Sequence, residues 1–412
     1  MRALLGRDRT CAHTAFAARN ESMRILHFSK FYPPVMGGIE SVAFELTEGM
    51  NRLGHRADVL CAHTERSTRI DIAALGYTIV RAGSLGKLLS TSLAPAMVWH
   101  ARRICDDYDV IDVQMPDPMA ALALWFARPR AKLVVRWQSD VVKQRRALKL
   151  YQPLQRWLLR RADAIVATTP PYAESSPWLQ EWKQKIEIIP NGISDVAPSG
   201  SEALAERLRQ QHAGKCLIFS LGRMTYYKGF DVLINAAAAL PDDCVVLVGG
   251  GGELLDAYRT QVASRGLAGK IAFLGRISDE ETLAYYAAAD VFCLASTVRA
   301  EAFGVVLLEA MAMGKPLVTA DIPGSGVPWI NMNGVTGLTT PVGDAAALAA
   351  ALDSLLHDEA LAKRMGAAAR QRFLQHFTAP TMVMRTIDLY RRLLAGSLQH
   401  QPSATPNKAL ES

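Results

Sequence analysis

The chain is poor in cysteine and has no long apolar run. Six cysteines are scattered over 412 residues, and no two of them form a Cys-x-x-Cys pair. This spacing argues against a zinc module and a disulfide framework, and it indicates a reducing, cytoplasmic compartment. Charges or glycines interrupt each apolar stretch before the ~20 residues that a membrane-spanning helix requires. We therefore expect no transmembrane helix.

Several ligand-binding patterns are also missing. No Gly-x-Gly-x-x-Gly follows the first strand of either half, which disfavours a dinucleotide-dependent dehydrogenase. No Asp-x-Asp pair stands in a loop with further ligands, so we expect that no metal ion and no cofactor is required. No DNA- or RNA-binding module is recognisable, so a nucleic-acid partner is not expected.

What is present is a chain long enough for two globular domains. Half of its residues are hydrophobic and 21% are charged, which is typical of a folded protein. We interpret residues 1–22 as a disordered leader or a mis-assigned start, and 396–412 as a disordered tail. Residues 23–195 and 214–378 each predict a Rossmann-like domain, and an amphipathic helix at about 379–395 is expected to cross back onto the first.

The apolar runs alternate with amphipathic helical segments in both halves. Runs such as "RILHFS", "CLIFSLG" and "DVFCLAS" are apolar throughout, as parallel strands buried on both faces should be. This alternation predicts an α/β fold of two doubly wound domains facing each other across a cleft. Ligands in such sheets bind beyond the carboxyl ends of the strands, so the loops after strands are the candidate sites.

Glycines and cations occupy several of these loops. Gly37 and Gly38 precede a helix after the first strand, where free N–H groups suit a phosphate, although a plain turn explains them as well. Arg223 and Lys228 follow the first strand of the second half and are suited to a diphosphate. Arg276 follows a later strand, where Asp279 is the expected N-cap of the next helix.

Two glutamates flank the apolar run "AFGVVLL". Glu301 follows the strand "DVFCLAS", and Glu309 lies eight residues later in the next helix. A helical rise of ~12 Å would let the two carboxylates reach different parts of one extended ligand. Carboxylates accept hydrogen bonds from sugar hydroxyls but repel phosphates, so acids for sugars and cations for phosphates indicate a nucleotide sugar.

The net charge of +7 is concentrated in one segment. Residues 141–161 contain seven lysines and arginines and no acid, with aromatic and apolar residues interleaved. The segment predicts a basic amphipathic helix, which is either a solvated surface or a seat for an anionic membrane or polyanionic acceptor.

The motifs together resemble a known family. "GRMTYYKGFDVLI", "VGGGGE", "FLGRISDEE" and "EAFGVVLLEAMAMGKPLVTADIPGSGVPWI" are similar to the retaining glycosyltransferases of family 4, which have the GT-B fold. The resemblance covers Met23 to about Leu394. "HFSKFYPPVMGGIESVAFEL" and "GSGVPWI" further resemble bacterial enzymes that add mannose or rhamnose in lipopolysaccharide O-antigen assembly.

The resemblance implies a role for each site residue. The first domain would be the acceptor side and the second would bind the nucleotide sugar. Arg223, Lys228 and Glu301 would be catalytic, the cations holding the diphosphate and Glu301 the sugar hydroxyls. The remaining donor contacts would come from Gly37, Gly38, Arg276 near the base, the backbone of Ala302, Phe303, Gly304 and Val305, and Glu309 on the ribose.

One position departs from the family. After the strand "KLVVRW" relatives often have a histidine beside the donor sugar, whereas this chain has Gln138, which can hydrogen-bond but cannot titrate. In retaining members the leaving phosphate is thought to take the acceptor proton, so the change is compatible with transfer. Asp140 is a second acceptor-side candidate, or it caps the basic helix that follows.

We therefore expect a hexosyl- or deoxyhexosyltransferase for lipopolysaccharide or exopolysaccharide synthesis. The resemblance favours a GDP-sugar, with mannose or rhamnose first, and a polyprenyl-diphosphate-linked glycan acceptor. The enzyme would be cytoplasmic and peripheral on the inner face of the cell membrane. The alternatives are a nucleotide-sugar 2-epimerase, which needs acid–base groups that Gln138 does not supply, and a non-catalytic nucleotide-sugar-binding subunit.

Overall fold

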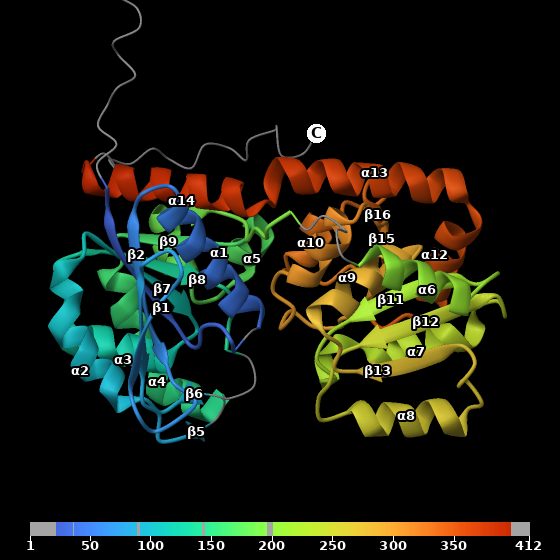
Figure 1. The fold of residues 1–412 in the computed structure, drawn as a ribbon, viewed down its shortest axis with the longest axis horizontal. Helices are drawn as coiled ribbons and strands as arrows, with labels where there is room; N and C mark the ends of the chain where they lie inside the picture. The colour runs from blue at the N-terminus through green and yellow to red at the C-terminus, as the bar shows by residue number, and fades with distance from the viewer. Residues whose placement is uncertain (1–21, 36, 89–90, 142–144, 196–200, 397–412) are drawn as a thin grey trace, which may run out of the picture.

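The protein consists of two parallel-sheet α/β domains that lie side by side (Figure 1). The computed structural model describes residues 22–35, 37–88, 91–141, 145–195 and 201–396. Most of the predicted leader, most of the tail and part of the segment joining the domains lie outside these residues. The two sheets confirm the predicted fold class.

The first sheet has the strand order β10-β9-β8-β7-β1-β2-β4-β3. All pairs are parallel except β3 with β4. The pattern "RIDI" of β3 was not predicted as a strand, because its side chains are largely exposed at the sheet edge. The strands are β1 (Arg24–Ser29), β2 (Arg56–Ala62), β3 (Arg69–Ile72), β4 (Thr78–Ala82), β7 (Val110–Met115), β8 (Lys132–Trp137), β9 (Ala164–Ala167) and β10 (Ile186–Ile188), with a separate hairpin of β5 (Lys87–Leu88) and β6 (Thr91–Ser92).

Helices cover both faces of this sheet. One face packs against α2 (Pro95–Ile104), α3 (Pro118–Ala127), α4 (Arg145–Arg161) and α5 (Pro170–Ser175), and the other against α1 (Gly38–Arg52). Short 3₁₀ helices lie at Cys105–Asp107 and Gln180–Lys185. No helix in the described part of the chain is long and apolar enough to cross a membrane.

The second sheet has the order β13-β12-β11-β14-β15-β16 and is entirely parallel. Its strands are β11 (Cys216–Leu221), β12 (Cys244–Gly249), β13 (Ile271–Gly275), β14 (Val291–Leu294), β15 (Leu317–Ala320) and β16 (Gly337–Thr340). Its helices are α6 (Glu202–Gln211), α7 (Phe230–Ala239), α8 (Leu255–Ser264), α9 (Asp279–Ala288), α10 (Val305–Ala312), α11 (Val327–Ile330), α12 (Ala345–His357) and α13 (Glu359–His376), with a 3₁₀ turn at Tyr226–Lys228.

The start of α9 corrects one sequence expectation. Ser278, not Asp279, is the N-cap: its side chain accepts a hydrogen bond from the backbone of Glu281, whose carboxylate accepts one from the Ser278 N–H. This reciprocal arrangement is a capping box, which satisfies two of the free N–H groups of the first turn. Asp279 lies one residue later, where its charge still favours the helix N-terminus.

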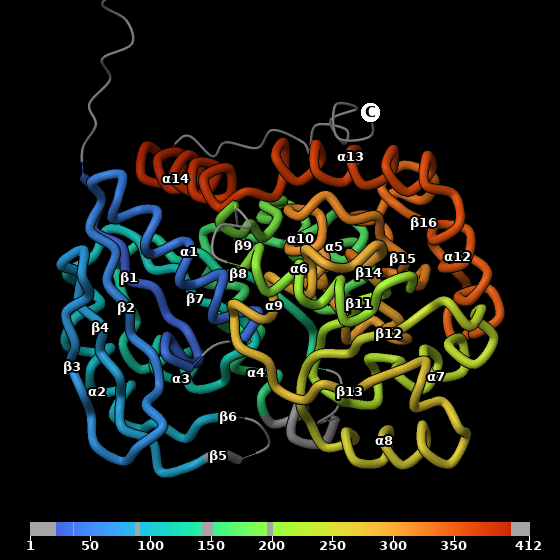
Figure 2. The backbone as a smooth tube through the Cα atoms, turned by 45° about the vertical axis from the view of Figure 1, so that its right-hand side comes forward, coloured from blue at the N-terminus to red at the C-terminus, as the bar shows by residue number. Residues whose placement is uncertain are grey.

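The last helix, α14 (Ala379–Leu394), returns to the first domain. It runs on from the direction of α13, so the two helices span both domains along one side (Figures 1 and 2). Inside the first domain, Asp112 Oδ2 accepts hydrogen bonds from Arg136 at 2.9 Å and from the Tyr390 hydroxyl at 2.7 Å. The side chains of Asp112 and Arg136 are fully buried in the first sheet, and the Tyr390 hydroxyl ties α14 to them.

Candidate functional site

Lys228 and Glu301 form a buried ion pair at the carboxyl ends of β11 and β14. The Lys228 Nζ lies 2.6 Å from Glu301 Oε2, and Ser296 Oγ donates to the same oxygen at 2.8 Å. The two charged side chains are only 10% and 9% exposed. Because β11 and β14 are neighbours in the sheet, the loops that follow them meet. The two charges therefore neutralise each other.

The backbone beside Glu301 offers unsatisfied donors. The helix α10 begins at Val305, after Gly304 in the left-handed region with φ of 83°. Within the described residues, no protein acceptor is found for the N–H groups of Gly304 and Val305. A Cβ at Gly38 would lie 3.7 Å from the Val305 side chain, so the N-termini of α1 and α10 adjoin. Two helix N-termini in one place favour an anion such as a phosphate.

The glycine run after β12 has a packing role. A Cβ on Gly250 would lie 2.0 Å from the carbonyl oxygen of Gly222, and one on Gly252 would lie 2.6 Å from that of Met224. These contacts press the loop against the backbone that carries Arg223, and only glycine allows such an approach. Arg276 crosses the same loop, with its Cγ 3.2 Å from a Cβ built on Gly251. Arg223 and Arg276 are both exposed.

Glu309 lies further along α10 and is enclosed more tightly than Arg223. The Tyr286 hydroxyl lies 2.7 Å from Glu309 Oε2 and 3.0 Å from the carbonyl of Val306. Burial raises the pKa of Glu309 to about 7, although the residue keeps some exposed surface. The helix starts at Val305, so the separation of Glu301 and Glu309 is not a helical rise of eight residues as the sequence suggested. Glu301 instead lies on the turn before the helix.

Gln138 is held in a network of buried amides. Its Nε2 donates to Gln114 Oε1 at 2.9 Å and lies 3.3 Å from Asn191 Oδ1. The Asn191 amide donates back to Gln138 Oε1 at 2.8 Å. These three side chains come from the loops or ends of β7, β8 and β10, on the first domain. None of them titrates, so the network can orient a ligand but cannot exchange a proton.

Asp140 joins the two domains. Its carboxylate pairs with Arg299 of the second domain at 2.5 Å, and it also accepts hydrogen bonds from the Trp137 indole and the Ser176 hydroxyl, each at 2.8 Å. Residues 142–144, just before the first described residue of α4, lie outside the described part of the chain, so the interpretation of Asp140 as a cap of the basic helix stays a prediction. Its acceptor-side role stays a prediction.

Arg299 makes the opposite half of this junction. Its Nε lies 3.0 Å from both Ser175 Oγ and the carbonyl oxygen of Gly324, and its guanidinium lies 4.2 Å from the centre of the Tyr172 ring. Ser175 in turn donates to the Gly324 carbonyl at 2.8 Å. We name this set, Asp140, Tyr172, Ser175, Arg299 and Gly324, the interdomain junction. Its member Arg299 lies two residues before Glu301 in the chain.

Comparison with known proteins assigns the family. Residues 205–372 match the family described as glycosyl transferases group 1, and residues 37–192 match the glycosyl transferase 4-like domain. The chain belongs to the group 1 glycosyltransferases. This confirms the resemblance seen in the sequence and makes the protein a transferase enzyme.

Two relatives and two solved structures illustrate the similarity. The O-antigen chain mannosyltransferase C of Escherichia coli is 34% identical over 375 residues, 90% of this chain and 99% of the relative. The D-rhamnosyltransferase WbpZ of Pseudomonas aeruginosa is 34% identical, over 87% of this chain and 93% of the relative. Sucrose-phosphate synthase of Thermosynechococcus elongatus superposes with a TM-score of 0.77 at 23% identity, covering 91% and 100% of the chains. Anabaena HepE, solved with UDP and glucose, gives 0.71 at 22% identity over 90% and 99%.

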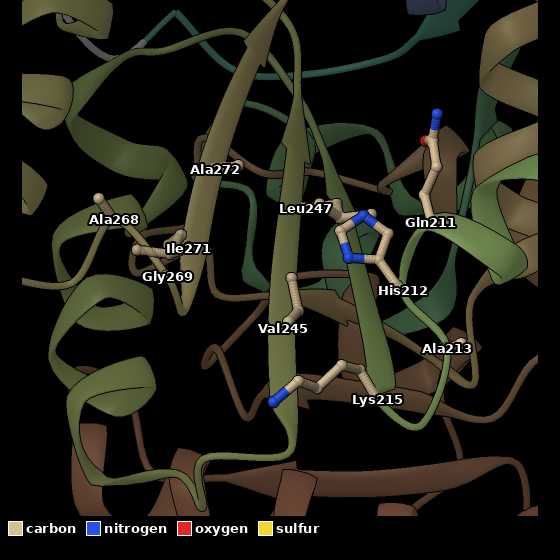
Figure 3. A pocket seen from close by; sticks show the side chains of 10 residues that line it. All are labelled: Gln211, His212, Ala213, Lys215, Val245, Leu247, Ala268, Gly269, Ile271 and Ala272. Atoms are coloured by element: carbon tan, nitrogen blue, oxygen red, sulfur yellow. The ribbon is translucent and has the colours of Figure 1, made fainter.

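One small cavity of this glycosyltransferase lies away from the predicted site (Figure 3). Its volume is about 250 Å³, and it opens beside the end of α6 and the starts of β12 and β13. Its lining includes the polar residues His212 and Lys215 and the apolar residues Val245, Leu247 and Ile271. It contains none of the predicted site residues, which lie beyond the opposite ends of the strands.

Sequence reasoning missed several residues of the candidate site. Ser296 donates a hydrogen bond to Glu301 and lies two residues after the end of β14, so its place after a strand was a usable signal. Arg299 stands two residues before Glu301, but its partner Asp140 is 159 positions away. Tyr286, which bonds Glu309, lies in α9 among apolar residues and gave no signal.

Proposed function

We propose that this glycosyltransferase transfers a hexosyl or deoxyhexosyl unit, with retention of configuration, from a nucleoside diphosphate sugar to a glycan acceptor. The observation that carries the proposal is the buried Lys228–Glu301 pair beside the open N-terminus of α10. A GDP-sugar carrying mannose or rhamnose is the first choice, because the two relatives above are named as a mannosyl- and a rhamnosyltransferase.

The charges of the site suit the two halves of such a donor. The diphosphate would accept hydrogen bonds from the N–H groups of Gly304 and Val305 and would replace Glu301 as the ion-pair partner of Lys228. Arg223, on the exposed loop, would also contact the diphosphate. Glu301, released from Lys228, would accept hydrogen bonds from sugar hydroxyls. Glu309 would accept those of the ribose, and Arg276 would lie near the base. We infer no metal requirement, since these groups supply the positive charge.

The transfer step needs no protein base in this proposal. The bond between the anomeric carbon and the diphosphate oxygen breaks, and a bond from that carbon to the acceptor oxygen forms on the same face. The acceptor hydroxyl gives its proton to the departing phosphate oxygen. Gln138, held by Gln114 and Asn191, orients the sugar without titrating. Lys228 and the helix termini stabilise the charge that grows on the leaving diphosphate.

A lipid-linked acceptor would bring the enzyme to a membrane surface. The helices α2 and α3 pack against each other and leave Trp99, Trp125 and Phe126 between 37% and 50% exposed. Aromatic residues of this kind favour the interface of a bilayer. In the basic helix, Arg156 pairs with Glu181 and Arg161 pairs with Asp163 at 2.9 Å, so part of its charge is compensated. Lys143 and the side chains of Arg145, Arg146 and Lys149 lie outside the described residues.

The test of the transfer is a donor screen read by product mass. The purified enzyme is incubated with GDP-mannose, GDP-rhamnose and UDP-sugars, each with a polyprenyl-diphosphate-linked glycan. We expect one hexose or deoxyhexose mass increment from a GDP-sugar, and an NMR coupling constant that shows a retained anomeric configuration. An inverted product refutes the retaining mechanism, and epimerised donor without transfer favours the 2-epimerase.

Membrane attachment has a separate test by flotation with anionic vesicles. Neutralising Lys143, Arg145, Arg146 and Lys149 together should shift the enzyme from the floated to the soluble fraction, because each basic residue contributes about 1 kcal/mol near such a surface. If this variant floats with the vesicles as wild type does, the basic helix does not bind the membrane. A variant in which Trp99 and Phe126 are replaced by serine then tests the exposed aromatic residues.

A further inference from the structure

Three possible metal ligands meet at the start of the second sheet. Cys216 is the first residue of β11, Asp243 directly precedes β12, and His357 is the last residue of α12. The Cys216 Sγ, a carboxylate oxygen of Asp243 and a ring nitrogen of His357 all lie within 4.8 Å of one another. The chain separates these residues by up to 141 positions, so the spacing of cysteines in the sequence does not reveal the group.

The imidazole of His357 is held between two carboxylates. Its Nδ1 lies 3.0 Å from Asp353 Oδ1, and its Nε2 lies 3.2 Å from Asp243 Oδ2. A neutral ring carries one proton and can donate to only one of the two. If Nδ1 donates to Asp353, the lone pair of Nε2 faces an oxygen that is also an acceptor. A second proton on the ring removes the repulsion between Nε2 and Asp243 Oδ2, and the hydrogen bond to Asp243 raises the pKa of His357 accordingly. A cation bound between Nε2 and Oδ2 removes the same repulsion.

The donor set suits a metal of the zinc type. Thiolate sulfur, imidazole nitrogen and carboxylate oxygen are the ligands that Zn²⁺ takes, at 2.0–2.3 Å. Ligand atoms around a tetrahedral ion lie roughly 3.3–3.8 Å apart by that geometry, so the present spacing has to contract by about 1 Å. The side chains of His357 and Asp243 are 42% and 46% exposed, so a shift of that size moves them largely through solvent. Asp353 would orient the ring from behind, as carboxylates behind metal-bound histidines do.

We propose that Cys216, Asp243 and His357 bind one divalent cation of the Zn²⁺ class, with a solvent molecule as fourth ligand. On binding, the Cys216 thiol loses its proton to solvent and the sulfur bonds the metal as a thiolate. The site is structural and not catalytic. It lies at the opposite end of β11 from the Arg223 and Lys228 loop, about 17 Å away at 3.3 Å per residue. A bound ion would fasten the end of α12 to the first residues of the sheet.

The test uses Co²⁺ as the probe on the full-length protein freed of metal with a chelator. We expect one equivalent of Co²⁺ to produce a near-ultraviolet band of thiolate-to-metal charge transfer, and Zn²⁺ to displace it and raise the melting temperature. Cys216→Ser should abolish the band. His357→Gln and Asp243→Asn should each weaken Co²⁺ binding at least tenfold, which is the effect of losing a ligand or its support.

The matched control is Cys105→Ser, which removes a buried thiol of the first domain and should leave the band unchanged. Circular dichroism and nucleotide-sugar binding establish that each variant is folded. The proposal is overturned if wild type shows no thiolate band at millimolar Co²⁺, or if the band survives Cys216→Ser. Equal affinity in His357→Gln overturns it as well, since the pair with Asp243 would then be an ordinary surface ion pair.

Discussion

The interdomain junction predicts a large effect from a residue that touches no part of the proposed donor site. Arg299→Ala removes the ion pair with Asp140 and the hydrogen bonds to Ser175 and Gly324. Asp140 is left with 5% of its side chain exposed and no cation beside it. Removing one partner of a buried pair costs about 3–5 kcal/mol, and Arg299 is partly exposed, so we take the lower value of about 3 kcal/mol.

This loss lowers the free energy that holds the two domains together, and it does not change the stability of either domain alone. A loss of about 3 kcal/mol lowers the ratio of enzyme with the junction formed to enzyme with the junction broken on the order of a hundredfold, at 1.4 kcal/mol per factor of ten. In the proposed function the acceptor side and the donor side must meet for transfer, so kcat/KM for transfer should fall at least tenfold. Nucleotide-sugar binding, which we assign to the second domain, should change by much less.

The assay is the initial rate of transfer from a labelled nucleotide sugar, with donor affinity measured separately by calorimetry. Arg265→Ala is the matched control, because Arg265 is an exposed arginine of the same domain bonded to Asn235 and far in sequence from the junction. Arg299→Lys should restore only part of the rate, since one ammonium cannot reach Asp140, Ser175 and Gly324 in the arginine's fork geometry. Wild-type kcat/KM in Arg299→Ala refutes the role of the junction.

Three further predictions concern Glu309 and Asp112. The pKa of Glu309 is raised to about 7 in the folded protein, so its protonated form contributes stability that is fully present below the ordinary pKa of a glutamate. This stability is lost as the pH rises through about 7. The free energy of unfolding of Glu309→Gln should therefore rise relative to that of wild type between pH 5 and pH 8. Binding of an intact nucleotide sugar should strengthen about tenfold from pH 6 to pH 8 as Glu309 ionises, and calorimetry should find no such trend in Glu309→Gln; a parallel trend in both excludes Glu309 as its source. Asp112→Ala leaves Arg136 buried without its partner and should lower the free energy of unfolding by about 3–5 kcal/mol in urea titrations, whereas a change below 1 kcal/mol contradicts the anchoring of α14.

The sequence was informative where a local pattern decides the structure. Apolar strands followed by loops with cations or acids predicted both the fold class and the general place of Lys228 and Glu301. Their contact depends on β11 and β14 being neighbours, which follows from the strand order and not from any local pattern. The sequence could not show the pairing of Asp140 with Arg299 or of Cys216 with His357, because such contacts join segments more than a hundred positions apart.

Local chemistry also had competing solutions that only the structure separates. Ser278 and Asp279 are both residue types that favour the N-cap position. The helix begins after Ser278 because Glu281 then occupies the N3 position and completes the capping box. The glycines after β12 suit a phosphate and a close backbone contact equally well, and here the approach to Gly222 and Met224 accounts for them. The exposed pattern of β3 resembles a loop, since an edge strand with polar faces has no apolar signal.

The most direct test of the central claim is a comparison of Glu301→Gln and Lys228→Met with wild type. Transfer to the proposed lipid-linked acceptor is followed by product mass, and binding of the nucleoside diphosphate is measured by calorimetry. We predict that Glu301→Gln loses transfer at least a hundredfold but still binds the nucleoside diphosphate, and that Lys228→Met loses both, since a charged hydrogen-bonding group contributes about 1.5–3 kcal/mol and more at a developing charge. Wild-type transfer by both variants would contradict the assignment of this buried pair to the donor.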